Sequence, residues 1–165
     1  MTEAIHNDYE VSSGPMLTWE VPYARLSDAT PTPTNPAMVT GLLPGQELTG
    51  TIISIDATLS VAVINFAPGA VYLFTVRNVL TYAGGPAEAT WGAINIGDPI
   101  YYDPTATMPV GTYLSTSPLD GAGAANPLFG RAVPASDADM ALFPKGAAGV
   151  ASTQSCAVMQ RGAGA

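Results

Sequence analysis

The 165-residue sequence contains very few of the side chains on which most enzyme mechanisms depend. It has one histidine, one lysine and one cysteine, and only 11% of its residues are charged. His6 lies in the polar N-terminus, so a catalytic triad or a multi-histidine metal site would have to be built around a terminal residue. Lys145 is not preceded by the glycine pattern of a phosphate-binding loop. We therefore predict that the protein is not an enzyme and has no catalytic residue, no cofactor and no metal.

The single cysteine, Cys156, excludes an internal disulfide. Its neighbours in the run from Ser155 to Met159 are mostly apolar, and no second histidine is available to activate its thiol. A buried packing role is therefore favoured over a nucleophilic one. The sequence is compatible with synthesis in a reducing cytoplasm.

Positive charge is also scarce, because 13 acidic residues stand against 5 basic ones and the net charge is -8. Such a chain repels phosphate backbones and anionic membrane surfaces, so we predict neither nucleic acid nor a membrane as a partner. The first ten residues include acidic side chains and no Lys or Arg, unlike a signal peptide. The longest apolar stretch, 57–74, is interrupted by polar residues, Pro and Gly, so we expect a soluble protein.

Prolines gather near the N-terminus, where the first 45 residues hold six of the fifteen. The proline-rich segment from Ser27 to Pro36 favours polyproline II and cannot be a central strand. The preceding residues 16–23 include large apolar side chains, which a fully solvated tail has no physical reason to keep. We predict an extended N-terminal arm at 1–40 that contacts another surface. The candidate contact residues are Trp19, Tyr23, Pro31, Pro33 and Pro36.

After about residue 40 the sequence changes to short stretches rich in Ile, Val, Thr and aromatic residues, separated by turn residues. This pattern predicts an all-β body at 41–160, a compact β-barrel or sandwich with little helix, followed by a flexible tail at 161–165. Only the run from Ser136 to Phe143 could form a short helix. The strand candidates are Glu47 to Ile55, Leu59 to Phe66, Val71 to Val76, Thr90 to Ile96, Ile100 to Tyr102, Gly111 to Ser115, Leu128 to Val133 and Gln154 to Gln160.

Two carboxylates, Asp98 and Asp103, flank a short apolar run and could hold a metal ion or act as an acid and base pair. Their spacing matches no EF-hand loop. The sequences Gly97-Asp98-Pro99 and Asp103-Pro104 are typical of turns in which each carboxylate accepts hydrogen bonds from nearby backbone N–H groups. The turn interpretation is therefore favoured.

Four aromatic residues raise a different possibility, a platform on which sugar rings could stack. Aromatic side chains on strands are more often anchors of a core or of a protein interface, so a sugar-binding face is the weaker interpretation. The four residues are Trp19, Trp91, Tyr101 and Tyr102.

Two segments resemble a known family. The run N-I-G-D-P-I-Y-Y-D, from Asn95 to Asp103, is followed after a Gly/Ala/Asn-rich loop by L-F-G-R-A-V, from Leu128 to Val133. This order is similar to that of the capsid cement, or head-decoration, proteins of tailed bacteriophages, in which a G-D-x-[VI]-Y-[WY]-D strand precedes a G-x-A strand. The chain departs from the family at Asn78, where glycine is common. The motif residues are Gly97, Asp98, Tyr101, Tyr102, Asp103 and Gly130.

The resemblance covers roughly residues 45 to 160 and implies a structural protein of the virion, made in the cytoplasm of the bacterial host. Such a protein binds the outer surface of the head as an oligomer, commonly a trimer, and stabilises the lattice against the pressure of packaged DNA. Its partners would be the major capsid protein and further copies of itself, either of which the arm could contact. The alternatives are a carbohydrate-binding or adhesion module on the virion surface and, third, a metal-assisted hydrolase using Asp98 and Asp103.

Overall fold

The computed structural model describes residues 16–43, 46–78, 94–106, 111–134 and 152–163. These residues form an all-β structure with a four-stranded sheet and a closed five-stranded barrel, which confirms the fold class expected from the sequence. The described part contains no α-helix and one short 3-10 turn, η2 (Tyr23–Arg25). The helix considered at 136–143 lies outside the described residues. No helix in the described ranges has the length and apolar character needed to cross a membrane.

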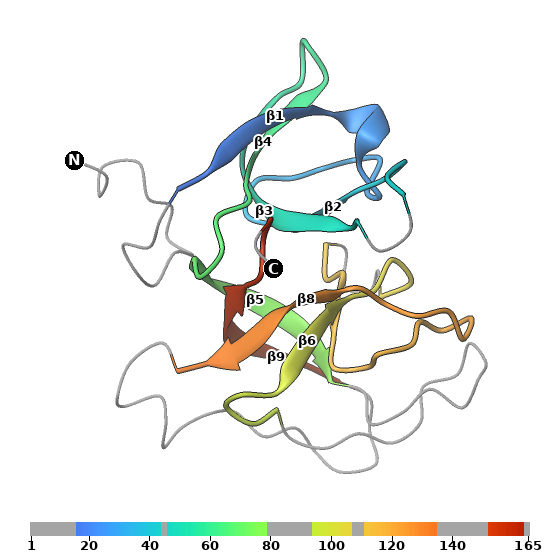
Figure 1. The fold of residues 1–165 in the computed structure, drawn as a ribbon, viewed down its shortest axis with the longest axis vertical. Coiled ribbons are helices and arrows are strands. Elements are labelled where there is room, and N and C mark those ends of the chain that lie inside the picture. Colours follow the sequence, from blue (N-terminus) through green and yellow to red (C-terminus); the bar gives the residue numbers. More distant parts are fainter. Residues whose placement is uncertain (1–15, 44–45, 79–93, 107–110, 135–151, 164–165) are drawn as a thin grey trace.

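The four-stranded sheet is built from the first part of the chain and lies at one end of the molecule (Figure 1). Its order is β1 (Thr18–Pro22), β4 (Val61–Asn65), β3 (Leu48–Asp56) and β2 (Pro36–Val39), and all neighbours are antiparallel. β3 and β4 form a hairpin, and the register between them shifts between Ile52 and Ser54. β2 is an edge strand, which is where a proline such as Pro36 is tolerated.

The sheet curls so that its two edges approach each other. The chain that follows β1 returns to β2, where Leu26 forms a β-bridge with Val39. The backbone N–H of Ser27 donates to the carbonyl oxygen of Met38 at 2.9 Å, and that of Thr40 donates to the carbonyl oxygen of Arg25 at 2.7 Å. The curled sheet encloses its own small apolar core, formed by Val21, Leu26, Ala37, Val39, Ile52, Ala62, Ile64 and Phe66.

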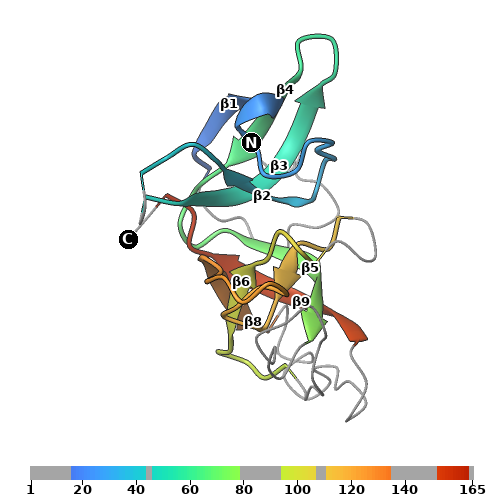
Figure 2. The same cartoon turned by 90° about the vertical axis from the view of Figure 1, so that its right-hand side faces the viewer.

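The barrel is formed by the second part of the chain and lies beneath the sheet (Figures 1 and 2). Its strands are β5 (Val71–Asn78), β7 (Leu114–Ser115), β6 (Pro99–Tyr102), β8 (Leu128–Val133) and β9 (Ser152–Gln160), and β9 closes the barrel by pairing with β5 along eight residues. Among the strands that the structure describes, only β5 and β7 pair in parallel. The barrel core is a separate apolar cluster that includes Tyr72, Phe74, Ile100, Tyr102, Phe129 and Val158.

The boundary expected near residue 40 does not separate two structural units. β1 and β2, which fall within the expected arm, pair with β4 and β3 of the expected body. The change from sheet to barrel comes instead at the link between β4 and β5, residues 66–70. Closely spaced prolines exclude a central strand, but they do not prevent the flanking residues from forming edge strands.

Part of the tail that the sequence predicts to be flexible, residues 161–163, is hydrogen-bonded to the rest of the protein. The backbone N–H of Arg161 donates to the carbonyl oxygen of Phe129 at 2.7 Å, and that of Ala163 donates to Phe66 at 2.8 Å. Residues 161–163 therefore connect the end of β9 to both the barrel and the sheet.

Candidate interaction surfaces

The contact residues expected in the arm divide into exposed and buried ones. Trp19 lies on β1 and is 48% exposed, with its ring 5.3 Å from the ring of Phe66. Tyr23 is half-buried and packs against the core of the sheet. Pro31 and Pro36 are buried, and Pro33 is half-buried. Of these five residues, Trp19 therefore offers the largest fraction of its surface to a partner, whereas the prolines serve mainly to pack the segment against the rest of the protein.

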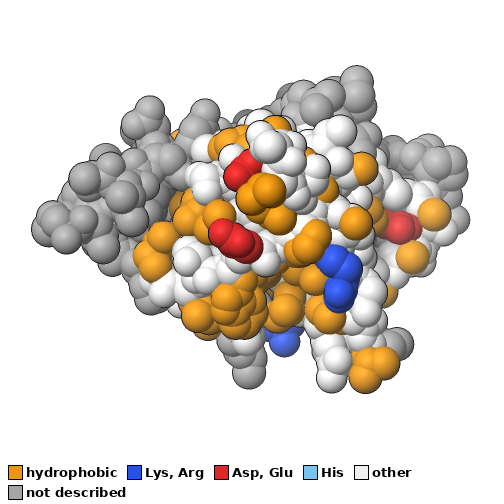
Figure 3. All heavy atoms as spheres, turned by 90° about the horizontal axis from the view of Figure 1, so that it is seen from above, with side chains coloured by type: hydrophobic (Ala, Val, Ile, Leu, Met, Phe, Trp, Pro, Cys, Tyr) orange, Lys and Arg blue, Asp and Glu red, His pale blue; other side chains and the backbone are white. Residues whose placement is uncertain are grey.

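Most of the exposed large apolar side chains belong to the sheet rather than to the barrel. Five of the eight in the described ranges lie between residues 17 and 59, and the two on the β3–β4 hairpin are Ile55 and Leu59, which are 37% and 69% exposed. Figure 3 looks onto this end of the molecule and shows apolar side chains there with only a few charged ones among them. The members of this set, the sheet patch, are Leu17, Trp19, Leu43, Ile55 and Leu59.

The two motif strands are neighbours in the barrel, where Ile100 of β6 lies opposite Gly130 of β8. Gly97 adopts a positive φ of 91° in the turn that leads into β6, and its backbone N–H donates to the carbonyl oxygen of Ala132 at 2.7 Å. The Arg131 guanidinium donates back to the carbonyl oxygen of Gly97 at 3.0 Å. The motif therefore organises a turn and a strand pair.

Asp98 and Asp103 cap the two turns that flank β6, as the turn interpretation expects. The Asp98 carboxylate accepts a hydrogen bond from the backbone N–H of Asn95 at 2.8 Å. The buried Asp103 carboxylate accepts from the backbone N–H and the hydroxyl of Thr105, at 2.8 and 2.6 Å. A strand rises about 3.3 Å per residue, so the two Cα atoms are about 16 Å apart and the structure does not bring the carboxylates together. Among the described residues no cluster of three or more His, Cys, Asp or Glu side chains could hold a metal ion.

The three described aromatic residues considered for sugar stacking, Trp19, Tyr101 and Tyr102, do not share an open face. Tyr102 is fully buried in the barrel core and stacks on Tyr113, with ring centroids 5.7 Å apart. Burial raises the pKa of the Tyr102 hydroxyl well above its usual value. Tyr101 is half-buried, and Trp91 lies outside the described residues. Tyr102 therefore cannot serve as a stacking platform, because its ring is already covered on both faces by protein.

A buried polar cluster joins the sheet to the barrel. Gln160, at the end of β9, is 1% exposed. Its Nε2 donates to the carbonyl oxygens of Asn65 and Ala67, both at 2.9 Å, and its Oε1 accepts from the Thr51 hydroxyl at 2.8 Å. Asn65 in turn donates to the Tyr72 hydroxyl of β5 at 2.8 Å. These hydrogen bonds connect β9 to β3 and β4, and β4 to β5, so they tie the sheet to the barrel.

This cluster was not predicted from the sequence, because Gln160, Asn65 and Thr51 are far apart along the chain. Asn65 and Gln160 are polar residues at the ends of apolar strands. Such a position is a weak signal, since a polar residue at a strand end is more often solvated than buried.

Cys156 is buried in the barrel, as the sequence suggested, and burial, together with the negative charge of Asp98, raises the pKa of its thiol from 9.0 to about 12. The folded protein therefore keeps this thiol protonated at pH values where the unfolded chain ionises. The resulting stability is fully present below pH 9 and is lost as the pH rises toward 12.

We expect the free energy of unfolding to fall between pH 9 and pH 11 less steeply in Cys156→Ala than in the unmodified protein. Denaturant titrations at a series of pH values measure the two slopes. The absolute stability of Cys156→Ala will be lower because of the lost packing, so only the slopes are compared. Identical slopes would show that the thiol does not contribute to the alkaline loss of stability.

The chain was compared with known proteins on sequence and on structure. No protein-family model, no curated protein and no solved structure matches it.

Proposed function

We propose that the protein is a structural component of a virion, a capsid cement protein that binds the outer surface of a tailed-phage head. It associates with further copies of itself, and together the copies stabilise the lattice of major capsid proteins against internal DNA pressure. In this role contact between surfaces is the function, and no catalysis is required. The observation that carries the proposal is the sheet patch, five exposed apolar side chains gathered in one module of a chain with few charges.

The sheet patch supports the proposal because apolar surface exposed on one module is typical of a site that a partner covers. The five side chains lie just before β1, on β1, on the β3–β4 hairpin and in the loop between β2 and β3. β1 adds a second feature, since it is an edge strand to which no other described strand pairs on its outer side. An open edge next to an exposed Trp19 suits pairing with an extended segment of a neighbour.

The architecture supports the proposal in a second way. The segments that resemble cement proteins, Gly97 to Asp103 and Leu128 to Val133, pair directly and belong to one closed barrel. A closed barrel has no free edge, so it supplies a rigid body, while the sheet supplies exposed apolar side chains. Interfaces of ordinary size bury about 800 Å² per partner, and repeating several of them around a symmetry axis gives high avidity from modest contacts.

The proposal is tested by binding the purified protein to expanded heads that lack the decoration layer, prepared from the phage that encodes the chain. We expect the double variant Ile55→Thr, Leu59→Ser to bind at least tenfold more weakly, because it removes apolar contacts without touching a core. The matched control is Ile96→Thr, Leu119→Ser, which alters two barrel residues that are 40% and 37% exposed.

The heads are sedimented with bound protein, and light scattering gives the mass of the free protein. Absence of binding by the unmodified protein would contradict the proposed function. Equal losses in the two double variants would contradict the assignment of the contact to the sheet.

A further inference from the structure

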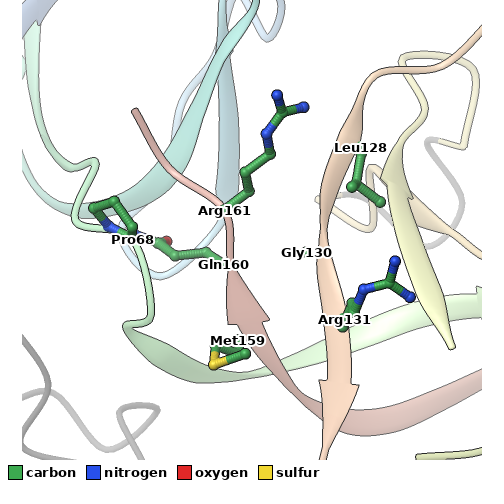
Figure 4. A pocket seen from close by; sticks show the side chains of 7 residues that line it. All are labelled: Pro68, Leu128, Gly130, Arg131, Met159, Gln160 and Arg161. Atoms are coloured by element: carbon green, nitrogen blue, oxygen red, sulfur yellow. The ribbon is translucent and has the colours of Figure 1, made fainter. Parts of the chain in front are cut away.

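A hollow of about 560 Å³ opens on the surface beside the end of β9. Its apolar wall consists of Pro68, Leu128 and Met159, and Met159 is 41% exposed. The guanidinium groups of Arg131 and Arg161 flank the same space (Figure 4). The hollow therefore offers an apolar surface next to two positive charges.

The two arginines are notable in so acidic a chain. The described residues include four cationic side chains, at positions 25, 77, 131 and 161, and two of them line this one hollow. The nearby Asp98 carboxylate accepts a hydrogen bond from the backbone of its own turn. Guanidinium groups pair well with carboxylates. Apart from the two arginines, Gln160 is the one polar residue that lines the hollow. A ligand that fits this environment therefore carries carboxylates interleaved with apolar side chains.

A segment of this composition is present in the chain itself. Residues 1–15, M-T-E-A-I-H-N-D-Y-E-V-S-S-G-P, contain Glu3, Asp8 and Glu10, no Lys or Arg, and apolar or aromatic residues between the carboxylates. Their charge is complementary to that of the hollow, whereas the rest of the chain, with 10 acidic and 5 basic residues, is acidic and repels them.

Two hydrogen bonds link the point from which this segment leaves the described structure to a residue that lines the hollow. Met16 contacts Asn65, whose Nδ2 donates to the Met16 sulfur at 3.4 Å. The Asn65 carbonyl oxygen accepts from Nε2 of Gln160 at 2.9 Å, and Gln160 lines the hollow. Fifteen residues can span about 50 Å when extended, so the reach is ample. Attachment at this point also gives the segment a high effective concentration at the hollow.

We propose that the hollow is a docking site for the acidic N-terminal segment, residues 1–15, of the same chain. Carboxylates of the segment pair with Arg131 and Arg161, and an apolar side chain between them packs on Leu128 and Met159. This inference concerns the free protein and does not depend on the proposed function.

The test uses the full chain with the photoreactive residue p-benzoylphenylalanine in place of Tyr9, which lies between two of the acidic residues. After irradiation and digestion, mass spectrometry is expected to locate cross-links in residues 128–133 and 159–161. Arg161→Gln should lower the yield of these cross-links at least fivefold, and added salt should lower it further. The matched control, Arg25→Gln, removes an exposed arginine of the sheet and should leave the yield unchanged.

Irradiating a mixture of the probe-bearing chain with an isotopically labelled chain that lacks the probe identifies the source of the segment. Cross-links confined to the unlabelled chain are expected. Cross-links to the labelled chain would overturn the proposal in favour of docking onto a second copy. Cross-links outside the hollow, or a yield that Arg161→Gln and Arg25→Gln lower equally, would overturn the docking site itself.

Discussion

Replacing Gln160 with leucine is expected to lower the free energy of unfolding by about 3 kcal/mol or more. The substitution keeps a side chain of similar size but removes the acceptor of the Thr51 hydroxyl and the Nε2 donor to the carbonyl oxygens of Asn65 and Ala67. The Ala67 oxygen keeps only a longer bond, from the backbone N–H of Ala70 at 3.4 Å. Each buried polar group left unpaired costs about 1 to 3 kcal/mol. The cost is high here because Gln160 is 1% exposed, so water cannot easily replace the lost hydrogen bonds.

Urea unfolding, followed by tryptophan fluorescence and by circular dichroism, measures this loss. Because Gln160 ties the sheet to the barrel, its loss should also let the two parts unfold less cooperatively. We therefore expect the urea midpoints from fluorescence and from circular dichroism to differ more in Gln160→Leu than in the unmodified protein. Thr51→Val is the matched control, since it removes only the bond to Oε1 and should cost about 1 kcal/mol. A neutral surface substitution changes the free energy of unfolding by about 0.5 kcal/mol or less. An equally small change in Gln160→Leu would contradict the inference that Gln160 holds the sheet to the barrel.

Gly130→Ala is expected to have the other large effect, a loss of about 3 kcal/mol or complete failure to fold. A Cβ atom at this position would overlap the carbonyl oxygen of Met159 in the paired strand and would also approach Cα of Gln160 to 3.0 Å. The obstacle is backbone in the interior of a closed barrel, which cannot move aside as the end of a flexible side chain can. The strand pair β8–β9 would have to separate locally.

Gly69→Ala is the matched control for this prediction. Gly69 has a positive φ of 85°, but a Cβ atom there would meet nothing within 4 Å. Its cost is therefore the conformational one alone, about 1 to 2 kcal/mol. Thermal unfolding and the yield of folded protein compare the two variants. Equal stability of Gly130→Ala and Gly69→Ala would show that β8 and β9 can move apart enough to hold a Cβ atom. The close approach of the Met159 backbone would then not be the reason for glycine at position 130.

Gly130 belongs to the motif on which the sequence-based resemblance to cement proteins rests, and its close approach to β9 explains why glycine is needed there. The same holds for Gly97, whose positive φ allows the turn before β6. These residues fix the backbone of the barrel. The exposed apolar side chains of the sheet patch lie elsewhere, in the other part of the fold.

The strands themselves could be predicted because they follow from local chemistry. Six of the expected strands correspond closely to β3, β4, β5, β6, β8 and β9, and Asp98 and Asp103 cap turns as their neighbouring Gly and Pro residues indicated. Runs of β-branched and aromatic residues between turn residues favour extended backbone wherever they occur. The one buried cysteine could be predicted for the same reason, since it sits within such a run.

The sequence alone thus determined an all-β protein with few charges, and it excluded a central strand for the proline-rich segment from Ser27 to Pro36. The tertiary structure decided what pairs with what: the curled sheet that includes β1 and β2, the burial of Tyr102, the Gln160 cluster and the hollow between Arg131 and Arg161. The reason is physical. Strand propensity is a property of neighbouring residues, whereas pairing, burial and charge proximity depend on residues that only folding brings together, such as Thr51 and Gln160.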